Sequence, residues 1–263
     1  MKLNAQNAIR FYAAAMDTGT GTPHRPQQLD TSTMQRVLIV VAHPDDAEYG
    51  TSAAVAEWVA RGIEVSYLLL TAGEAGMQRS PEEAGPLRAT EQRAACDAVG
   101  ATRLTILDFP DGMLEVSLEL RRAIAAEIRR VRPDTVVCGS GALFVDWGID
   151  HADHRAAGIA TIDAIRDADN RWVFRELAEV EGLEPWGATQ VLFTGTSPTH
   201  FVEVSEPSAE AAVRSLASHE AYLADLSWHP TPRDLVGGVL ERGGELSGVD
   251  RAVTFARYAL RGE

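Results

Sequence analysis

Two short segments, far apart in the chain, combine histidine and aspartate at spacings that suit a metal site. The first is "HPDD" (43–46) and the second is "DHADH" (150–154). Imidazole nitrogens and carboxylate oxygens together form a ligand set that suits Zn²⁺, and a catalytic zinc ion keeps three protein ligands and one open position for water. The two segments offer more groups than three ligands require. A carboxylate left off the metal could therefore serve as the base for that water.

The first segment alone leaves two interpretations open. A His-Pro-Asp sequence after an apolar run is also typical of a turn in which an aspartate caps the next helix. The presence of a second His/Asp cluster favours the metal site, provided that the fold brings the two clusters together.

Alternating strands and helices are predicted from residue 37 onward. The apolar run "VLIVVA" (37–42) predicts a strand that is buried on both faces, because it does not alternate polar and apolar residues. Further strands are predicted at 64–71, 103–109, 134–140, 189–195 and 200–205, and helices at 51–62, 87–101, 117–133, from near His154, and at 208–223. This order predicts an α/β fold that is Rossmann-like, with a mostly parallel, doubly wound sheet. In such sheets the active site lies at the carboxyl ends of the strands, where "HPDD" and "DHADH" are both expected.

The chain is predicted to contain one main domain with an N-terminal extension. Residues 1–35 are expected to form a short helix (4–16) and a connector rich in Gly, Thr and Pro, and residues 36–263 a single α/β domain. The polar segment 72–86 is longer than a simple connection requires, which makes it a candidate active-site lid.

Composition excludes several classes of function. The formal net charge of −14 over 263 residues argues against a nucleic-acid partner, because such binding needs a basic patch. No apolar run approaches the roughly 18 to 20 residues that a membrane span needs. The N-terminus lacks the continuous apolar region of a secretory signal, and Cys96 and Cys138 have no spacing typical of a metal or disulfide motif. We therefore expect a cytoplasmic protein.

The two motifs together resemble a known family. "AHPDD" after a buried strand, followed much later by "HxDH", resembles the LmbE-like (PIG-L type) zinc-dependent N-deacetylases. Supporting matches are "LTAGEAG", "LRATEQRAACDAVGA" and "FPDGML". Glu48 follows the first motif one position later than the commoner Asp-Asp-Glu, as in the branch that resembles bacillithiol-type deacetylases. The C-terminal "SHEAYL" departs from the commoner His-Arg-Ser-Gln pattern, so this half of the chain gives no guide to the substrate.

The resemblance implies a reaction and a set of metal ligands. The reaction would be removal of an N-acetyl or other N-acyl group from a small molecule that contains an amino sugar. His43, Asp46 and His154 look like the ligands of Zn²⁺, or of another divalent metal that suits the same donors. Asp45 looks like the general base toward the attacking water.

The resemblance also implies roles around the metal. His151 would stabilise the oxyanion or assist the leaving amine, and Asp153 would hold a histidine in its productive tautomer. Arg88 and Asp111 are candidates for binding sugar hydroxyls. Relatives often assemble as trimers or hexamers, which makes a homo-oligomer the expected state.

Three alternatives to a deacetylase make different demands on the sequence. A nucleotide-binding domain is disfavoured, because no Gly-x-Gly-x-x-Gly follows the first strand and the acidic "HPDDAE" would repel a pyrophosphate. A non-catalytic metal- or sugar-binding module would not need the base Asp45. An amidase that acts on a thiol (mycothiol-like) conjugate could use the same site, and the motifs do not separate it from a deacetylase.

Overall fold

The computed structural model describes residues 25–145 and 148–261, so the helix predicted at 4–16 lies outside the described residues. The described strands are β1 (Gln27–Gln28), β2 (Arg36–Val41), β3 (Glu64–Leu69), β4 (Arg103–Ile106), β5 (Thr135–Gly139), β6 (Phe144–Val145), β7 (Gly148–Ile149), β8 (Gln190–Thr194), β9 (His200–Glu203) and β10 (Ala252–Ala259). The described helices are α2 (Ser52–Ala60), α3 (Pro81–Val99), α4 (Leu118–Val131), α5 (Ala152–Asp169), α6 (Arg175–Glu179), α7 (Glu206–Ala217), α8 (Glu220–Asp225) and α9 (Pro232–Ser247).

One large sheet holds these strands, except for β6 and β7, which pair with each other as a hairpin. The strand order is β1-β9-β10-β8-β5-β2-β3-β4. The strands from β8 to β4 in this order run parallel, whereas β10 runs antiparallel to both of its neighbours. The prediction of a mostly parallel, Rossmann-like sheet is confirmed.

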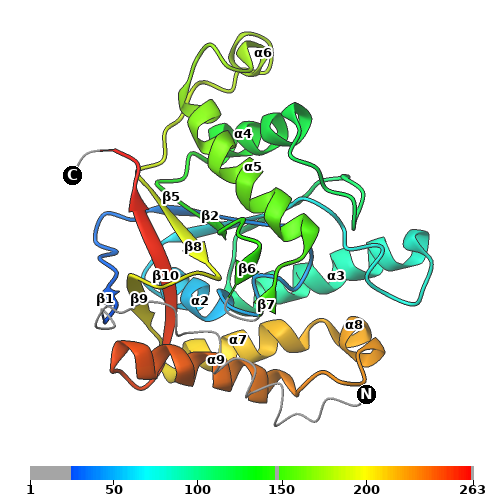
Figure 1. Ribbon diagram of the computed structural model, residues 1–263, viewed down its shortest axis with the longest axis vertical. Helices are drawn as coiled ribbons and strands as arrows, with labels where there is room; N and C mark the ends of the chain where they lie inside the picture. Colours follow the sequence, from blue (N-terminus) through cyan, green and yellow to red (C-terminus); the bar gives the residue numbers. More distant parts are fainter. Residues whose placement is uncertain (1–24, 146–147, 262–263) are drawn as a thin grey trace.

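The strand order reverses at β2, because β3 and β4 extend the sheet on one side while β5 and β8 extend it on the other. The helices that follow β2 and β5 cover opposite faces: α2 packs with α7, and α5 packs with α4. Figure 1 shows α4 and α5 above the sheet and α7 and α9 below it. Such a reversal opens a crevice at the carboxyl ends of the two strands. The loops after β2 and β5, which carry the two His/Asp clusters, therefore meet there.

Strand β2 is anchored on both faces. Val37 and Ile39 lie in the apolar cluster that contains Trp58 of α2, whereas Leu38 and Val40 lie in the cluster of α4 and α5. All five side chains are buried, and each such burial contributes roughly 1.5–3 kcal/mol. The first metal-site segment thus follows a rigid strand.

The lid prediction was partly wrong, because residues 81–86 belong to α3. Ser80 is the extended N-cap residue, Pro81 takes the first helical position, and Glu82 and Glu83 lie in the first turn. All three features favour a helix start at this point. Pro86 lies inside the helix and does not stop it. The loop after β3 is correspondingly shorter than predicted.

The single helix predicted at 208–223 was also wrong. It is divided into α7 and α8, and His219 is the N-cap residue of α8 with φ −83° and ψ 49°. This break turns the His219 side chain inward, where it is fully buried.

The segment predicted as a connector takes part in the sheet. Gln27 and Gln28 of β1 pair in parallel with β9, and Leu29 and Met34 are buried in the core. The elements that were not predicted are the hairpin β6–β7, α6, α9 and β10.

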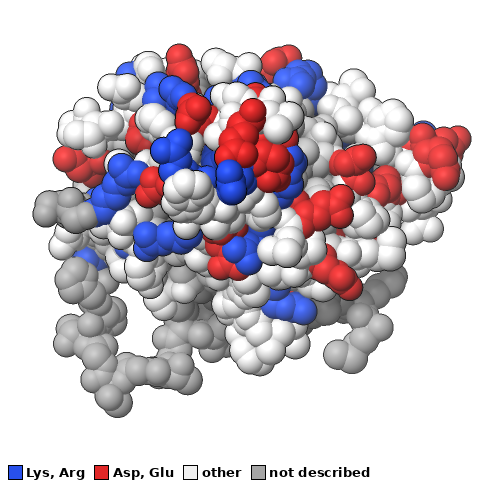
Figure 2. All heavy atoms as spheres, turned by 90° about the horizontal axis from the view of Figure 1, so that it is seen from above, with Lys and Arg blue, Asp and Glu red and all other residues white. Residues whose placement is uncertain are grey.

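The charges on the face that carries α6 and α4 are mixed rather than separated (Figure 2). Arg122 of α4 forms ion pairs with Glu176 and Glu181, at α6. Within the described residues, every helix is too short or too polar to cross a membrane.

Candidate metal centre and active site

The segment "HPDD" forms a tight turn and does not cap α2. The amides of Glu48 and Tyr49 donate to the carbonyl oxygen of Asp45, at 2.8 and 3.2 Å. Helix α2 begins only at Ser52, with Thr51 as its N-cap residue. Within the turn, Asp46 Oδ2 accepts the backbone N–H of His43 at 2.9 Å. Neither aspartate is the N-cap residue of α2, so the capping interpretation is excluded.

Three side chains from the two clusters converge on one point. His43 Nδ1 lies 3.3 Å from His154 Nε2. The Asp46 carboxylate faces both rings, with Oδ1 at 3.1 Å from His154 Nε2 and Oδ2 at 3.6 Å from His43 Nδ1. These are the three residues that the sequence predicts as metal ligands. Their donor atoms all lie within 4.8 Å of one another.

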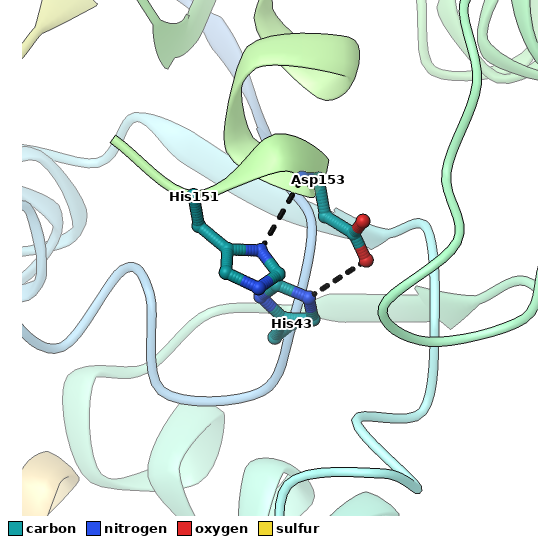
Figure 3. Close-up of side chains that lie close together, drawn as sticks. All are labelled: His43, His151 and Asp153. Carbon is teal, nitrogen blue, oxygen red and sulfur yellow. Dashed lines mark hydrogen bonds and ion pairs between the residues drawn. The ribbon is translucent and has the colours of Figure 1, made fainter. Parts of the chain in front are cut away.

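The other nitrogen of each ring is held by a carboxylate. His154 Nδ1 lies 2.9 Å from Asp150 Oδ1. His43 Nε2 lies 3.2 Å from Asp153 Oδ2 and 3.0 Å from Asp111 Oδ1. Figure 3 shows Asp153 reaching from the start of α5 to His43 in the loop after β2. Carboxylates behind metal-binding histidines fix the tautomer and orient the ring, so this pattern leaves His43 Nδ1 and His154 Nε2 to face a metal.

The surrounding carboxylates favour positive charge at this point. Burial lowers the pKa of His43, but Asp111 and Asp46 outweigh it and raise this pKa to about 11. Burial likewise lowers the pKa of His154, while Asp150 and Asp46 raise it to about 10. The pKa of Asp46 lies well below its usual range, because the two histidines outweigh its burial. Two protonated rings this close repel each other, so a divalent cation between them fits the donor set better than two protons do.

A second set of possible ligands consists of His43, His151 and Asp153. Its carboxylate is already engaged, because Asp153 Oδ2 accepts from the amide of Gly112 at 2.7 Å and Oδ1 from the amide of Leu114 at 3.1 Å. The set His43, Asp46 and His154 therefore fits a metal better.

Asp45 is buried beside the proposed metal site, with a side chain that is only partly satisfied. Its backbone has a φ of 83°, which is rare for a residue other than glycine. Arg88 Nη2 donates to Oδ1 at 3.2 Å, whereas Oδ2 has no hydrogen-bond partner among the described residues. Burial raises the pKa of Asp45 to about 7, and the Arg88 guanidinium opposes that rise. A buried carboxylate with a free oxygen and a pKa near neutrality suits a general base.

His151 stands at the exposed side of the site as the N-cap residue of α5. Its Nδ1 accepts the backbone N–H of Asp153 at 3.3 Å (Figure 3). An accepting Nδ1 places the ring proton on Nε2. The His151 ring lies 5.4 Å from that of His43 and 5.5 Å from that of His154, centroid to centroid. His151 can therefore donate a hydrogen bond to a substrate at the metal site.

The two residues predicted to bind sugar hydroxyls contact protein groups. Arg88 is 2% exposed, and it donates to the carbonyl oxygens of Gly73 and Pro44 at 2.9 and 2.7 Å. Asp111 Oδ2 accepts the amide of Ala75 at 2.7 Å. Binding of sugar by these two residues stays a prediction. Their contacts show them holding the site's loops together.

Sequence reasoning missed Asp150, which orients His154. Its signal was present, because Asp150 precedes His154 by four residues, a separation that places side chains on one face at a helix start. The contacts of Gln92, Glu48 and His219 behind Asp45 were not predicted either, although all three lie in segments that the sequence motifs include.

The chain is similar to known deacetylases. A family model described as PIG-L, GlcNAc-PI de-N-acetylase, matches residues 38–165. The chain is 31% identical over 199 residues to diacetylchitobiose deacetylase of Thermococcus kodakarensis, an alignment that covers 74% of this chain and 73% of that protein. It is 30% identical over 199 residues to the 1D-myo-inositol 2-acetamido-2-deoxy-alpha-D-glucopyranoside deacetylase of Thermomonospora curvata, with 64% and 63% covered. Among solved structures, N,N'-diacetylchitobiose deacetylase from Pyrococcus horikoshii shares the fold with a TM-score of 0.76 at 20% identity, covering 98% of this chain and 94% of that one.

Proposed function

The chain belongs to the PIG-L family of de-N-acetylases, and on that premise we propose that it is a metal-dependent deacetylase of a small N-acetylated amino-sugar conjugate. One observation carries the proposal: His43 Nδ1, His154 Nε2 and Asp46 converge on one point, beside the buried carboxylate of Asp45 with its free oxygen. The names of the relatives, which are deacetylases of amino sugars, support the choice of substrate class.

The proposed ligands are His43, Asp46 and His154, and Zn²⁺ is the first choice of metal. Two imidazole nitrogens and one carboxylate suit this ion, although other divalent metals accept the same donors. Bound there, a divalent cation would lower the pKa of a water molecule and polarise the amide carbonyl.

The protein's own residues would then move the protons. Asp45, with a pKa of about 7, is ionised in about half of the molecules at neutral pH, and in that form it can accept a proton from the attacking water. The water oxygen forms a bond to the acetyl carbon, and the Nε2–H of His151 donates to the carbonyl oxygen as it becomes negative. When the carbon–nitrogen bond breaks, the proton held by Asp45 passes to the leaving amine. Acetate and the free amino sugar result.

The experiment is an amine-release assay on a panel of amides. The panel contains N-acetylglucosamine, diacetylchitobiose, N-acetylglucosaminyl inositol, N-acetylglucosaminyl malate and a thiol-sugar amide. We expect release from at least one acetylated sugar, loss of activity with a chelator, and recovery when Zn²⁺ is added back. Hydrolysis of the thiol-sugar amide alone would identify a conjugate amidase. Retention of the metal with no amide hydrolysed would identify a binding module and refute the proposal.

A further inference from the structure

The backbone of Asp45 needs support, because its left-handed conformation (φ 83°) is unfavourable for a residue with a side chain. Two side chains of α3 supply that support. Arg88 Nη2 donates to the carbonyl oxygen of Pro44 at 2.7 Å and to Asp45 Oδ1 at 3.2 Å. Gln92 Oε1 accepts the backbone N–H of Asp45 at 3.0 Å. Because residues four apart in a helix share a face, Arg88 and Gln92 approach the turn together.

The orientation of the Gln92 amide is set by Glu48. Gln92 Nε2 donates to the Glu48 carboxylate, at 3.3 Å from Oε1 and 3.4 Å from Oε2. A backbone N–H can only donate, so Gln92 must turn its carbonyl oxygen toward Asp45 and its amide nitrogen toward Glu48. All three residues are at most 3% exposed, so water does not compete for these bonds.

Glu48 is in turn held by groups from the C-terminal half of the chain. Ser215 Oγ of α7 donates to Glu48 Oε1 at 3.1 Å. His219 Nε2 lies 3.6 Å from Glu48 Oε2, and both side chains are fully buried. Burial lowers the pKa of His219, but Glu48 outweighs it and raises this pKa above its usual value. The break between α7 and α8 places the His219 ring beside the Glu48 carboxylate.

We propose that Gln92 is a positioning residue for the general base, held in its productive orientation by Glu48 and His219. The inference rests on the proposed function, because it assigns Asp45 the role of base. His219 and Glu48 do not touch the substrate. They act through Gln92, which accepts the backbone N–H of Asp45 and so fixes the backbone that carries its carboxylate.

The test replaces Gln92 by Leu, which has a similar size but forms no hydrogen bonds. We expect Gln92→Leu to lower kcat by about tenfold or more, because misplacing a catalytic group is costly. KM should stay within about twofold, and the metal content should stay near that of the wild type. Amide hydrogen exchange of the peptide 43–49, followed by mass spectrometry without metal, should become faster. Glu48→Gln removes the carboxylate that orients the Gln92 amide, so it should also lower kcat and speed the exchange of peptide 43–49. This variant replaces Gln92→Leu in the test if the latter fails to fold.

The matched control is Gln190→Leu. Gln190 is 6% exposed. Its side-chain amide donates to Thr135 Oγ1 and accepts from Arg257 Nε. Gln190 and Thr135 lie at the amino ends of β8 and β5, opposite to the end of the sheet that carries the site. This variant should leave kcat and the exchange of peptide 43–49 unchanged. The inference is overturned if amide hydrogen exchange of peptide 43–49 is as slow in Gln92→Leu as in the wild type. It is also overturned if the kcat of this variant falls only in proportion to lost metal. Should the wild type hydrolyse no amide, the exchange measurement alone decides the role of Gln92.

Discussion

Two adjacent aspartates, the proposed base Asp45 and the proposed ligand Asp46, have different surroundings. Asp46 faces two histidines, which keep its pKa well below the usual range, whereas Asp45 is buried against Arg88 with a pKa of about 7. The tight turn separates the two side chains by giving Asp45 a left-handed backbone. The proposed division into one ligand and one base therefore rests on the backbone of a single residue.

The first prediction concerns Asp45 itself. Asp45→Asn keeps the size of the side chain and removes its ability to take a proton. We expect kcat to fall by roughly 10²–10⁴-fold, the usual contribution of a general base, while the metal content stays near one ion per chain. Steady-state kinetics and elemental analysis of the same sample measure both. Full activity in this variant would contradict the assignment, and His154→Ala, which should lose the metal, provides the contrast.

At the scale of elements, the loop after β3 is attached to α3 through Gly73. Its carbonyl oxygen accepts from Arg88 Nη1 at 2.9 Å, and its φ is 65°. A Cβ at this position would lie 2.3 Å from Arg88 Nη1. The loop, the helix and the turn of Asp45 are thus coupled through one buried guanidinium.

Replacing Gly73 by Ala tests this coupling, with Gly62→Ala as the control. Gly62 also has a positive φ, of 83°, but a Cβ there would meet no atom within 4 Å. Each variant should lose about 1 kcal/mol of unfolding free energy from the strained backbone, and Gly73→Ala should lose more. Only Gly73→Ala should also lower kcat, because it displaces Arg88. Urea unfolding and steady-state kinetics check this, and equal effects of the two variants would speak against the coupling.

For the whole molecule, the site concentrates carboxylates in a chain whose net charge is already −14. Protonated His43 and His154 partly balance them in the metal-free protein, with pKa values of about 11 and 10. A raised pKa stabilises the fold fully below the unfolded value of about 6.5, and that contribution is lost as pH rises toward the folded value. A metal bound at the proposed site would replace these protons and would stabilise the folded state by mass action.

Thermal unfolding should therefore depend on metal and pH together. Added Zn²⁺ should raise Tm, and the increase should be larger near pH 8.5 than near pH 6.5, because fewer protons then compete for the histidines. Calorimetry at fixed protein and metal concentrations measures both increases. The variant His154→Ala should show little increase at either pH. An increase that is equal or larger at the lower pH would contradict the proposed ligands.

Local patterns in the sequence were enough to predict the fold class and the two His/Asp clusters at the carboxyl ends of the strands. Apolar runs and His/Asp spacing are local patterns, and a parallel sheet leaves little choice about where its strands end. The contacts between buried polar side chains, in contrast, depend on how distant segments pack together. Gln92 meets Glu48 across 44 positions in the sequence, and Ser215 meets Glu48 across 167. Such contacts leave no periodicity in the sequence, because they arise only when α3, α7 and the turn of Asp45 pack into one buried space.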